Sequence, residues 1–385
     1  MPIEIKEFLT DTELTSESIW NRQWVKWAQI LLSLVILFLF LISLELIATS
    51  GKLLGSEFTE GIIHTTSLPI VSLFIGLLAT ALIHSSSTVT STMVVLVAAG
   101  IIKLETAVYL MMGSNIGTSI TGLMVAFGNL GSPKAFRRGF MAGSSHAVFN
   151  ILSALIFFPL EYYWKILSRT SDYLAAHMVN AGVVGASWFS FHDKIIAPIA
   201  AWLPRLVQVQ PLVILFCSLV LLFMSIYALT LIFKYLMLRG NGGKRLKNWL
   251  ANPFRSLLTG IGTTAAIHSS SVTTSFCVMI AATDKVSPKK MFPYIMGANV
   301  GTTVTALMAA IGRSEVAIAV ALAHFLFNLF GVLIFYPFPV FRNIPVVVAR
   351  WTANKAHHNL AFAFAYLTLI FFAIPFLVIF LAEKL

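Results

Sequence analysis

The sequence predicts an all-α protein that crosses a membrane several times, and three observations support this. Of the 385 residues, 58% are hydrophobic and only 11% are charged, and the mean hydropathy is +0.87. Soluble domains are much less apolar, so lipid is the expected solvent. Apolar runs at 28–48, 211–233, 316–335 and 360–381 are each long enough to cross a bilayer core of about 30 Å. The third observation is an internal repeat, which predicts two inverted-topology repeats with re-entrant helical hairpins and broken helices.

The first apolar run is expected to be an uncleaved anchor helix. An acidic stretch that includes Glu4, Asp11 and Glu17 precedes it, unlike the basic start of a signal peptide, and the run is too long for one. Counting the later runs, we expect about eight full crossings together with shorter segments.

Few groups within the apolar segments can react or titrate. Cys217 and Cys277 are expected to be buried, inert thiols, because neither a disulfide framework nor a metal-binding spacing is present. Glu45 is the only acid expected to be buried, which argues against a proton relay made of acids. The formal net charge of +11 resides in short loops between apolar segments, so nucleic acid is not an expected partner.

The internal repeat lies in the middle of the chain. Residues 76–124 align with 260–308 without a gap, and 20 of the 49 positions are identical. Polar residues are identical between the two copies more often than apolar residues are. The identities gather in two motifs, His84-Ser85-Ser86-Ser87 with His268-Ser269-Ser270-Ser271, and Gly113-x-Asn115-x-Gly117-Thr118 with Gly297-x-Asn299-x-Gly301-Thr302. A weaker match follows each copy, His146-x-x-Phe149-Asn150 before Phe157 and His324-x-x-Phe327-Asn328 before Phe335.

Each His-Ser-Ser-Ser motif is expected at the tip of a helical hairpin. The apolar stretches on either side, 68–83 and 93–102 in the first copy, are too short to be two comfortable crossings. A hairpin that enters and leaves on one side fits better, provided that protein or a wet cavity encloses its break.

The basic loops predict that the two copies have opposite orientations. Loops 134–138 and 239–255 are rich in Lys and Arg and are therefore placed in the cytoplasm. By parity, the first hairpin returns outside at 103–105 and the second returns inside at 284–290. The predicted organisation is a cytoplasmic segment 1–26, a first repeat 27–160, an extracytoplasmic connection 161–210, a second repeat 211–340, and a C-terminal segment with the last helix 341–385.

The serine tips have the chemistry of an anion site. Serine hydroxyls, free backbone N–H groups and the positive end of a helix dipole would all meet there. Two such tips from inverted copies would surround an oxyanion near the middle of the membrane with neutral donors. Neutral donors suit a transporter, because the bound ion must also leave.

The Gly-x-Asn-x-Gly-Thr segments have the chemistry of a cation site. Their glycines permit close packing or unwinding, and oxygens of Asn and Thr can bind a hard cation such as Na⁺ together with freed carbonyls. An anion site beside a cation site implies coupled transport.

Each of these features also has a simpler interpretation. Serine and threonine in membrane helices often serve only packing and hydrogen bonding between helices, although the symmetric recurrence favours a site. His146 and His324 are expected to be satisfied hydrogen bonders between helices. Arg137 and Arg138 are expected to be orientation charges, with contact to the anion as the alternative.

With both repeats and Phe136-Arg137-Arg138 in view, the chain between about 60 and 340 resembles the type II sodium-dependent phosphate cotransporters and their bacterial relatives. The hallmark of that family is a Gln-Ser-Ser-Ser motif in each inverted repeat. The resemblance implies a phosphate site at Ser85, Ser86, Ser87, Ser269, Ser270 and Ser271, with Arg137 and Arg138. It implies a sodium site at His268, Ser269, Thr302 and Thr305, to which we add Asn299, with symmetry-related candidates His84, Asn115, Thr118 and Thr121.

The chain departs from the family where both glutamines are replaced by histidine. An imidazole is a poor ligand for Na⁺, and its ordinary pKa of about 6.5 makes pH-sensitive binding or coupling conceivable. The alternative is that His84 and His268 only donate hydrogen bonds as an amide would. Ala147 and Gly122 also replace an aspartate and an asparagine that the resemblance leads one to expect.

The leading hypothesis is Na⁺-coupled symport of inorganic phosphate by alternating access across the cytoplasmic (inner) membrane. Phosphate, Na⁺ and the bilayer are the expected partners, and no cofactor beyond the coupling ions is expected. Transport of sulfate or arsenate, and proton coupling through His84 and His268, are the alternatives. An intramembrane hydrolase is disfavoured, because the chain carries two equivalent constellations rather than one nucleophile and one base. A channel or a membrane scaffold is the remaining class.

Overall fold

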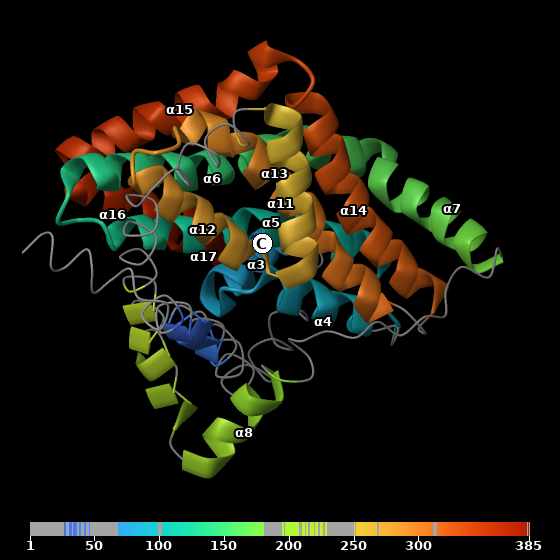
Figure 1. Cartoon of the computed structure of the whole chain (residues 1–385). Coiled ribbons are helices and arrows are strands. Elements are labelled where there is room, and N and C mark those ends of the chain that lie inside the picture. The colour runs from blue at the N-terminus through green and yellow to red at the C-terminus, as the bar shows by residue number, and fades with distance from the viewer. Residues whose placement is uncertain are drawn as a thin grey trace, which may run out of the picture.

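In a computed structural model of the chain (Figure 1), every described element is a helix, which confirms the predicted all-α class. The structure describes residues 68–98, 102–180, 197–207, 252–267, 269–310 and 314–382, and single residues between 27 and 46, at 195, between 210 and 228, and at 250 and 384. The helices are α3 (Pro69–Ile83), α4 (Ser86–Ala98), α5 (Leu104–Phe127), α6 (Pro133–Trp164), α7 (Ile166–Asn180), α8 (Ala197–Val207), α11 (Pro253–Ile267), α12 (Ser270–Ala282), α13 (Pro288–Ala310), α14 (Glu315–Phe335), α15 (Pro339–His358), α16 (Leu360–Thr368), the π-helix η2 (Leu369–Ala373) and α17 (Ile374–Ala382).

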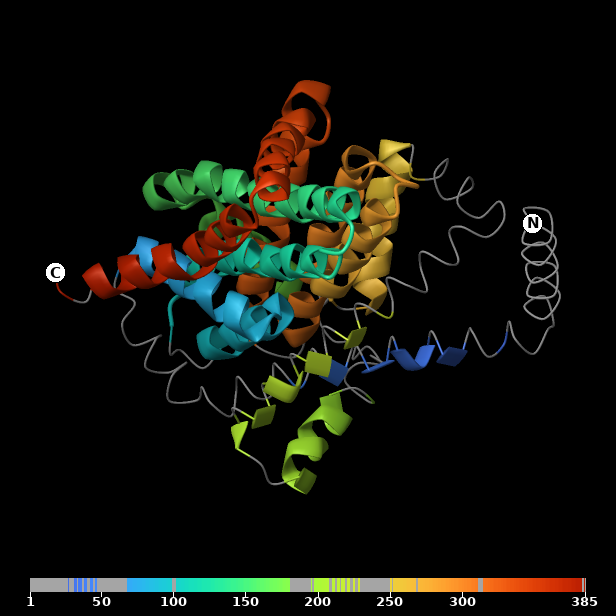
Figure 2. The ribbon, with the colours of Figure 1, turned by 90° about the vertical axis from the view of Figure 1, so that its left-hand side faces the viewer.

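Four helical stretches of the described part are long and apolar enough to cross a membrane. They are Leu104–Phe127, Pro133–Trp164, Glu315–Phe335 and Leu360–Ala382. Helix α5 is almost wholly buried by its neighbours, whereas Leu360–Ala382 exposes most of its apolar side chains and runs out of the bundle to the C-terminus (Figure 2). The chain is therefore a multi-pass membrane protein, with α5 near its centre and the last helix facing lipid. The predicted crossings 28–48 and 211–233 fall mostly outside the described residues.

The two hairpins are pairs of short helices. Helices α3 and α4 contain 15 and 13 residues, so neither reaches across a bilayer at 1.5 Å per residue. Pro69 starts α3, and His84 ends it in the left-handed conformation with φ of 57°. Helices α11 and α12 have the same two lengths. The predicted break is therefore present in the first copy, and in the second copy it falls at position 268, which lies outside the described residues.

Glycines allow each hairpin to press against the long helix that follows it. A Cβ atom on Gly113 would overlap the carbonyl oxygen of Leu73, and one on Gly76 would overlap that of Leu110. In the second copy, Gly297 meets Leu257 in the same way. The backbones of α3 and α5, and of α11 and α13, thus approach more closely than any residue with a side chain permits.

Aromatic contacts show a pseudo-two-fold relation between α6 and α14. Phe149 and Phe157 correspond to Phe327 and Phe335, each pair being 178 positions apart. Phe149 packs edge-on against Phe335 with ring centroids 5.5 Å apart, and Phe157 packs edge-on against Phe327 at 5.8 Å. A Cβ atom on Gly331 would lie 3.0 Å from the hydroxyl of Ser153, its counterpart at the same offset. The two aromatic contacts are therefore equivalent to each other, and Gly331 meets its own counterpart, as expected across a local two-fold axis.

The outer helices are exchanged between the repeats. Helix α7 packs along α14 of the second copy, and α15 packs along α6 of the first, as Figure 1 shows. The predicted connection 161–210 therefore begins with the end of α6 and a packed helix. The segment 341–385 likewise begins within α15, which belongs to the bundle.

Two expectations about single residues were wrong. Glu45 was expected to be the only buried acid, but Glu161 is fully buried. It accepts hydrogen bonds from the backbone N–H of Leu167 at 2.7 Å and from Ser168. Its carboxylate caps the start of α7, so its charge is stabilised by that helix end. Cys217 was expected to be buried but is exposed, whereas Cys277 is buried as predicted. Glu45 lies outside the described residues.

Ionic contacts place the bases of the two hairpins at opposite ends of α6. At the start of α6, Arg138 pairs with Asp284, which follows the second hairpin. At its end, Lys165 pairs with Glu105, which follows the first hairpin, with 2.9 Å between Nζ and Oε1. Because the 32 residues of α6 span about 48 Å, these contacts agree with the inverted orientation predicted from the basic loops.

The glycine packing predicts a strong effect of one added methyl group. Gly113→Ala and Gly297→Ala should each lower the stability by at least 1–3 kcal/mol, roughly the penalty of overpacking, because only backbone can give way. Thermal unfolding in detergent measures this. Gly262→Ala on α11 is the matched control, because a Cβ atom there meets no heavy atom within 4 Å. Equal stability of all three variants would contradict the close packing.

The positions of the hairpin bases predict opposite exposure to the two compartments. In a background with Cys217→Ala and Cys277→Ala, single cysteines introduced by Asp284→Cys and Glu105→Cys should react with a membrane-impermeant maleimide from opposite sides. The reason is that the native side chains, exposed at Asp284 and partly exposed at Glu105, lie at opposite ends of α6. Labelling of intact cells and of inside-out vesicles measures the side. Reaction of both cysteines from one side would exclude inverted repeats.

Candidate anion and cation site at the hairpin tips

The two hairpin tips meet inside the molecule. The hydroxyl of Ser271 donates a hydrogen bond of 3.2 Å to the backbone carbonyl of His84, which joins motifs 187 positions apart. Ser86, Ser270 and Ser271 are all buried, at 2–3% exposure, in a protein whose outer surface faces lipid. The structure therefore brings the predicted serines of both copies to one place.

Two helices begin at this meeting point. Helix α4 starts at Ser86 and α12 starts at Ser270. Ser269 precedes α12 as its N-cap, and its hydroxyl accepts from the N–H of Val272 at 3.4 Å. The remaining N–H groups of a first helical turn have no partner within the helix, and the dipole makes that end positive. Ser85 and Ser87 are half-buried beside them, so hydroxyl donors and helix ends are combined as an anion requires.

His84 has a structural position in this arrangement. Its backbone N–H bonds to the carbonyl of Thr80 at 2.8 Å and closes the end of α3. Its side-chain Nδ1 lies 3.2 Å from the hydroxyl of Thr121 on α5. The imidazole thus links the hairpin tip to the helix behind it. Position 268 lies outside the described residues.

The Gly-x-Asn-x-Gly-Thr segments lie within continuous helices. Helices α5 and α13 run through both motifs, so the glycines serve close packing and the expected freed carbonyls are not found there. Thr118 and Thr302 donate to the carbonyls of Ser114 and Ala298, at 2.8 and 2.9 Å. A hydroxyl that donates in this way keeps acceptor lone pairs, so Thr302 remains able to bind a cation. Thr305 lies half-buried one turn further along α13.

A chain of buried hydrogen bonds connects the repeats behind the tips. Nε2 of His146 lies 2.7 Å from Oδ1 of Asn299. The amide of Asn299 donates to Oδ1 of Asn150 at 2.5 Å, and Asn150 donates to the backbone carbonyl of Asn115 at 2.7 Å. His146 is therefore a hydrogen bonder between helices, as predicted, but it is not fully satisfied, because its buried Nδ1 has no partner among the described residues. Asn150 was not predicted as a site residue, although its recurrence as Asn328 was the available signal.

The second histidine does not match its prediction. Within the part of the chain that the structure describes, neither ring nitrogen of the buried His324 has a hydrogen-bond partner. Asn328 donates only to the carbonyl of His324, one turn earlier in α14, at 3.0 Å, and its Oδ1 is also unpartnered.

The two arginines have partners other than the serines. Arg137 donates from Nε to Oδ1 of Asn354 on α15, at 2.7 Å. Arg138 donates from Nε to the carbonyl of Ala281 at 3.1 Å and pairs with Asp284 at the base of the second hairpin. These contacts attach the start of α6 to α15 and α12, which agrees with their interpretation as orientation charges.

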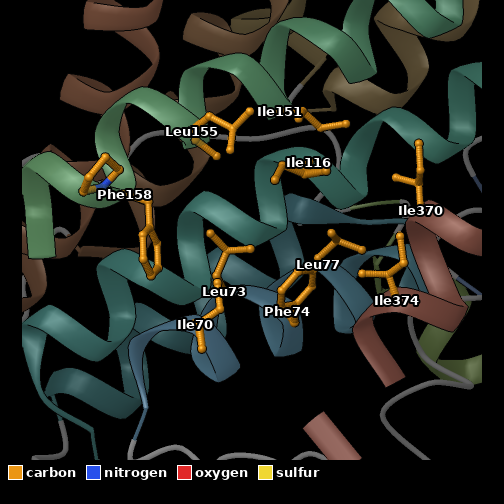
Figure 3. A pocket seen from close by; sticks show the side chains of 12 residues that line it. Ile70, Leu73, Phe74, Leu77, Ile116, Ile151, Leu155, Phe158, Ile370 and Ile374 are labelled. Atoms are coloured by element: carbon orange, nitrogen blue, oxygen red, sulfur yellow. The ribbon is translucent and has the colours of Figure 1, made fainter. Parts of the chain in front are cut away.

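The molecule also has an apolar pocket, separate from the serines. It has a volume of about 400 Å³ and lies between α3, α5, α6 and the last helix, with Phe74, Ile116, Leu155 and Ile370 among its walls (Figure 3). A pocket without polar lining offers nothing to an ion. Across the described ranges, no group of three or more His, Cys, Asp and Glu side chains is arranged to hold a metal.

A buried meeting point of two helix ends, carried on paired hairpins in a multi-pass bundle, is an arrangement found in membrane transporters of ions. The chain matches the family described as Na⁺/Pi-cotransporter over residues 39–165 and 221–378, and it therefore belongs to that family.

Several mammalian proteins are similar to this chain. The human sodium-dependent phosphate transport protein 2B is 26% identical over 90% of the chain and 64% of its own length. The mouse and rabbit sodium-dependent phosphate transport proteins 2A are each 27% identical, over 90% and 96% of the chain and 66% and 70% of their own lengths. The chain thus spans somewhat less than two thirds of the human relative. No solved structure matches it.

The contact between the tips predicts a loss of stability on removing one hydroxyl. Ser271→Ala should lower the stability by about 0.5–1.5 kcal/mol, because the carbonyl of His84 loses its donor. Thermal unfolding in detergent measures the change. Ser119→Ala is the control, since that buried hydroxyl bonds only within its own helix, to Ile116 at 2.6 Å. A smaller effect for Ser271→Ala than for Ser119→Ala would argue against the contact.

Proposed function

We propose that this protein is a Na⁺-coupled symporter of inorganic phosphate that works by alternating access in the cytoplasmic membrane. The observation that carries the proposal is the hydrogen bond between Ser271 and the carbonyl of His84, because it joins the two hairpin tips, where α4 and α12 begin and where the serines of both motifs are buried or half-buried. Membership of the Na⁺/Pi-cotransporter family supports the choice of phosphate and sodium.

In this proposal, Ser85, Ser86, Ser87, Ser269, Ser270 and Ser271 bind the phosphate oxygens. Their hydroxyls and the adjoining N–H groups donate, so the anion is held without a fixed positive charge. Such a site can release its ion again when the repeats rearrange. Arg137 and Arg138 are left out of the proposed site, because both are engaged with α15 and α12.

The sodium ion is assigned to the second copy, at Ser269, Asn299, Thr302, Thr305 and position 268. Hydroxyl and amide oxygens are hard ligands that suit Na⁺. In the symmetry-related set, His84 is held against Thr121 and has no carboxylate beside it in the contacts described. This supports a hydrogen-bonding role for His84 and favours sodium over protons as the coupling ion.

Uptake of radiolabelled phosphate into proteoliposomes tests the proposal. We expect an inward Na⁺ gradient to drive accumulation and an inward proton gradient without Na⁺ not to do so, because the proposed ligands are oxygens. The double variant His84→Gln and His268→Gln should retain Na⁺-driven uptake within about threefold, since an amide can replace the imidazole as a donor.

Accumulation driven only by protons, and lost in the double variant, would instead make the histidines the coupling groups. Competition by sulfate at concentrations similar to that of phosphate would overturn the assignment of the anion. Equilibration without accumulation under either gradient would indicate a channel.

A further inference from the structure

The structure combines a symmetric frame with an asymmetric set of polar contacts. The aromatic pairs Phe149 with Phe335 and Phe157 with Phe327 have nearly the same geometry, with interplanar angles of 75° and 72°. The glycine contacts of α3 with α5 are repeated by α11 with α13. The hydrogen bonds of the two His-x-x-Phe-Asn motifs are not repeated.

In the first motif the polar groups are connected across the repeats, and only Nδ1 of His146 lacks a partner among the described residues. His146 and Asn150, both on α6, hold the two ends of the Asn299 side chain, at 2.7 and 2.5 Å. We call these three residues the closed clasp. The amide of Asn299 thereby loses its freedom to turn toward other partners.

In the second motif the same residue types are not connected. His324 and Asn328 lie on α14, which packs against α5, and α5 carries Asn115. Symmetry predicts that they would hold the Asn115 side chain. Instead, that side chain donates back to the carbonyl of Met111 in its own helix at 3.0 Å. His324, Asn328 and Asn115 therefore form an open clasp.

The open clasp is energetically unfavourable as it stands. His324 and Asn328 are each 1% exposed, and three of their polar atoms, Nδ1, Nε2 and Oδ1, have no partner among the described residues. Buried polar groups without partners are rare and destabilising in native proteins, and those that occur call for an explanation. A second arrangement in which they are used provides one.

We propose that His146 and His324 are positioning residues that hold Asn299 and Asn115 in alternation, one clasp closing as the other opens when the repeats rearrange. This inference rests on the proposed alternating-access function. The present structure then corresponds to one of the two orientations of the transporter, in which the site opens to one side of the membrane. In the opposite orientation, His324 would form a hydrogen bond to Asn115.

The alternation would act on the cation site. Asn299 is a proposed sodium ligand, and in the closed clasp its Oδ1 accepts from His146. Opening the clasp would free this oxygen, while closing the other clasp would remove Asn115 from its intrahelical contact. The two asparagines would thus exchange roles without any change in the frame of glycines and aromatic rings.

Thiol labelling from the two sides of the membrane tests this inference. The reporter is Ser87→Cys at the first hairpin tip, in a background with Cys217→Ala and Cys277→Ala. The ratio of labelling rates by a membrane-impermeant maleimide, in right-side-out and inside-out vesicles, reports the balance of orientations. His146→Ala should shift this ratio in one direction and His324→Ala in the other, each by about three- to tenfold, the effect of one net buried hydrogen bond.

The controls separate a positioning role from a merely structural one. Ser145→Ala, beside His146 on α6, removes a buried hydroxyl that bonds within its own helix to Ala142, and it should leave the ratio unchanged. His146→Gln and His324→Gln should restore the ratio, because the glutamine amide can donate in place of the imidazole. Asn150→Ala and Asn328→Ala form a second opposed pair if the alanine variants of the histidines do not fold.

Shifts in the same direction, or no shift in either pair, would overturn the alternation. The result is independent of the transported ion, because labelling needs no phosphate. Uptake is measured separately in the protein with Ser87 intact, because Ser87 is itself a proposed phosphate ligand. Opposite labelling shifts, with no phosphate accumulation by that protein, would leave the clasps in place and reject the proposed substrate. Normal phosphate uptake with unshifted labelling ratios would support the proposed substrate and reject the alternating clasps.

Discussion

The close approach of each hairpin to the helix behind it is the constraint on which the rest of the structure depends. A helix that breaks inside a membrane leaves backbone groups that lipid cannot satisfy, so protein must enclose the break. Here the backbones of α3 and α5 enclose the break by packing directly against each other, at Gly76 with Leu110 and at Gly113 with Leu73. Any side chain at these positions would push the hairpin outward and carry its polar tip toward lipid.

Enclosure also determines what the tips are able to bind. Because α5 is buried along nearly its whole length, the serines at the ends of α4 and α12 are held away from lipid by protein on several sides. In such surroundings, hydroxyls and helix ends are stronger donors than in water, since the effective dielectric constant is low. In the proposed function, such a site would bind its oxyanion with partial charges alone.

Much of this arrangement could be predicted from the sequence because it repeats. The offset of 184 positions identified the hairpins, their tips and the glycine motifs, and each of these depends on local sequence. The partners of Arg137 and Arg138 could not be predicted, because they are set by how α6 meets α12 and α15. Glu161 was missed for a similar reason, since only the fold shows that a helix begins where its carboxylate lies.

The difference between the two clasps was beyond any reading of the sequence. His146 and His324 occur in matching motifs, so pattern alone assigns them one role. Their contacts differ in the structure, and the proposed alternation accounts for this difference by two states of the protein. On that proposal, the sequence indicates what the two states share, and the structure corresponds to one of them.

The exchange of outer helices bears on how such a molecule could arise. Helix α7 covers α14, and α15 covers α6, so each half provides the wall of the other. A chain of half this length would leave an apolar flank bare, and two copies related by a two-fold axis would be needed to cover both flanks. Duplication would therefore have fused an existing pair of identical subunits. The covalent link would have made their association in the membrane intramolecular.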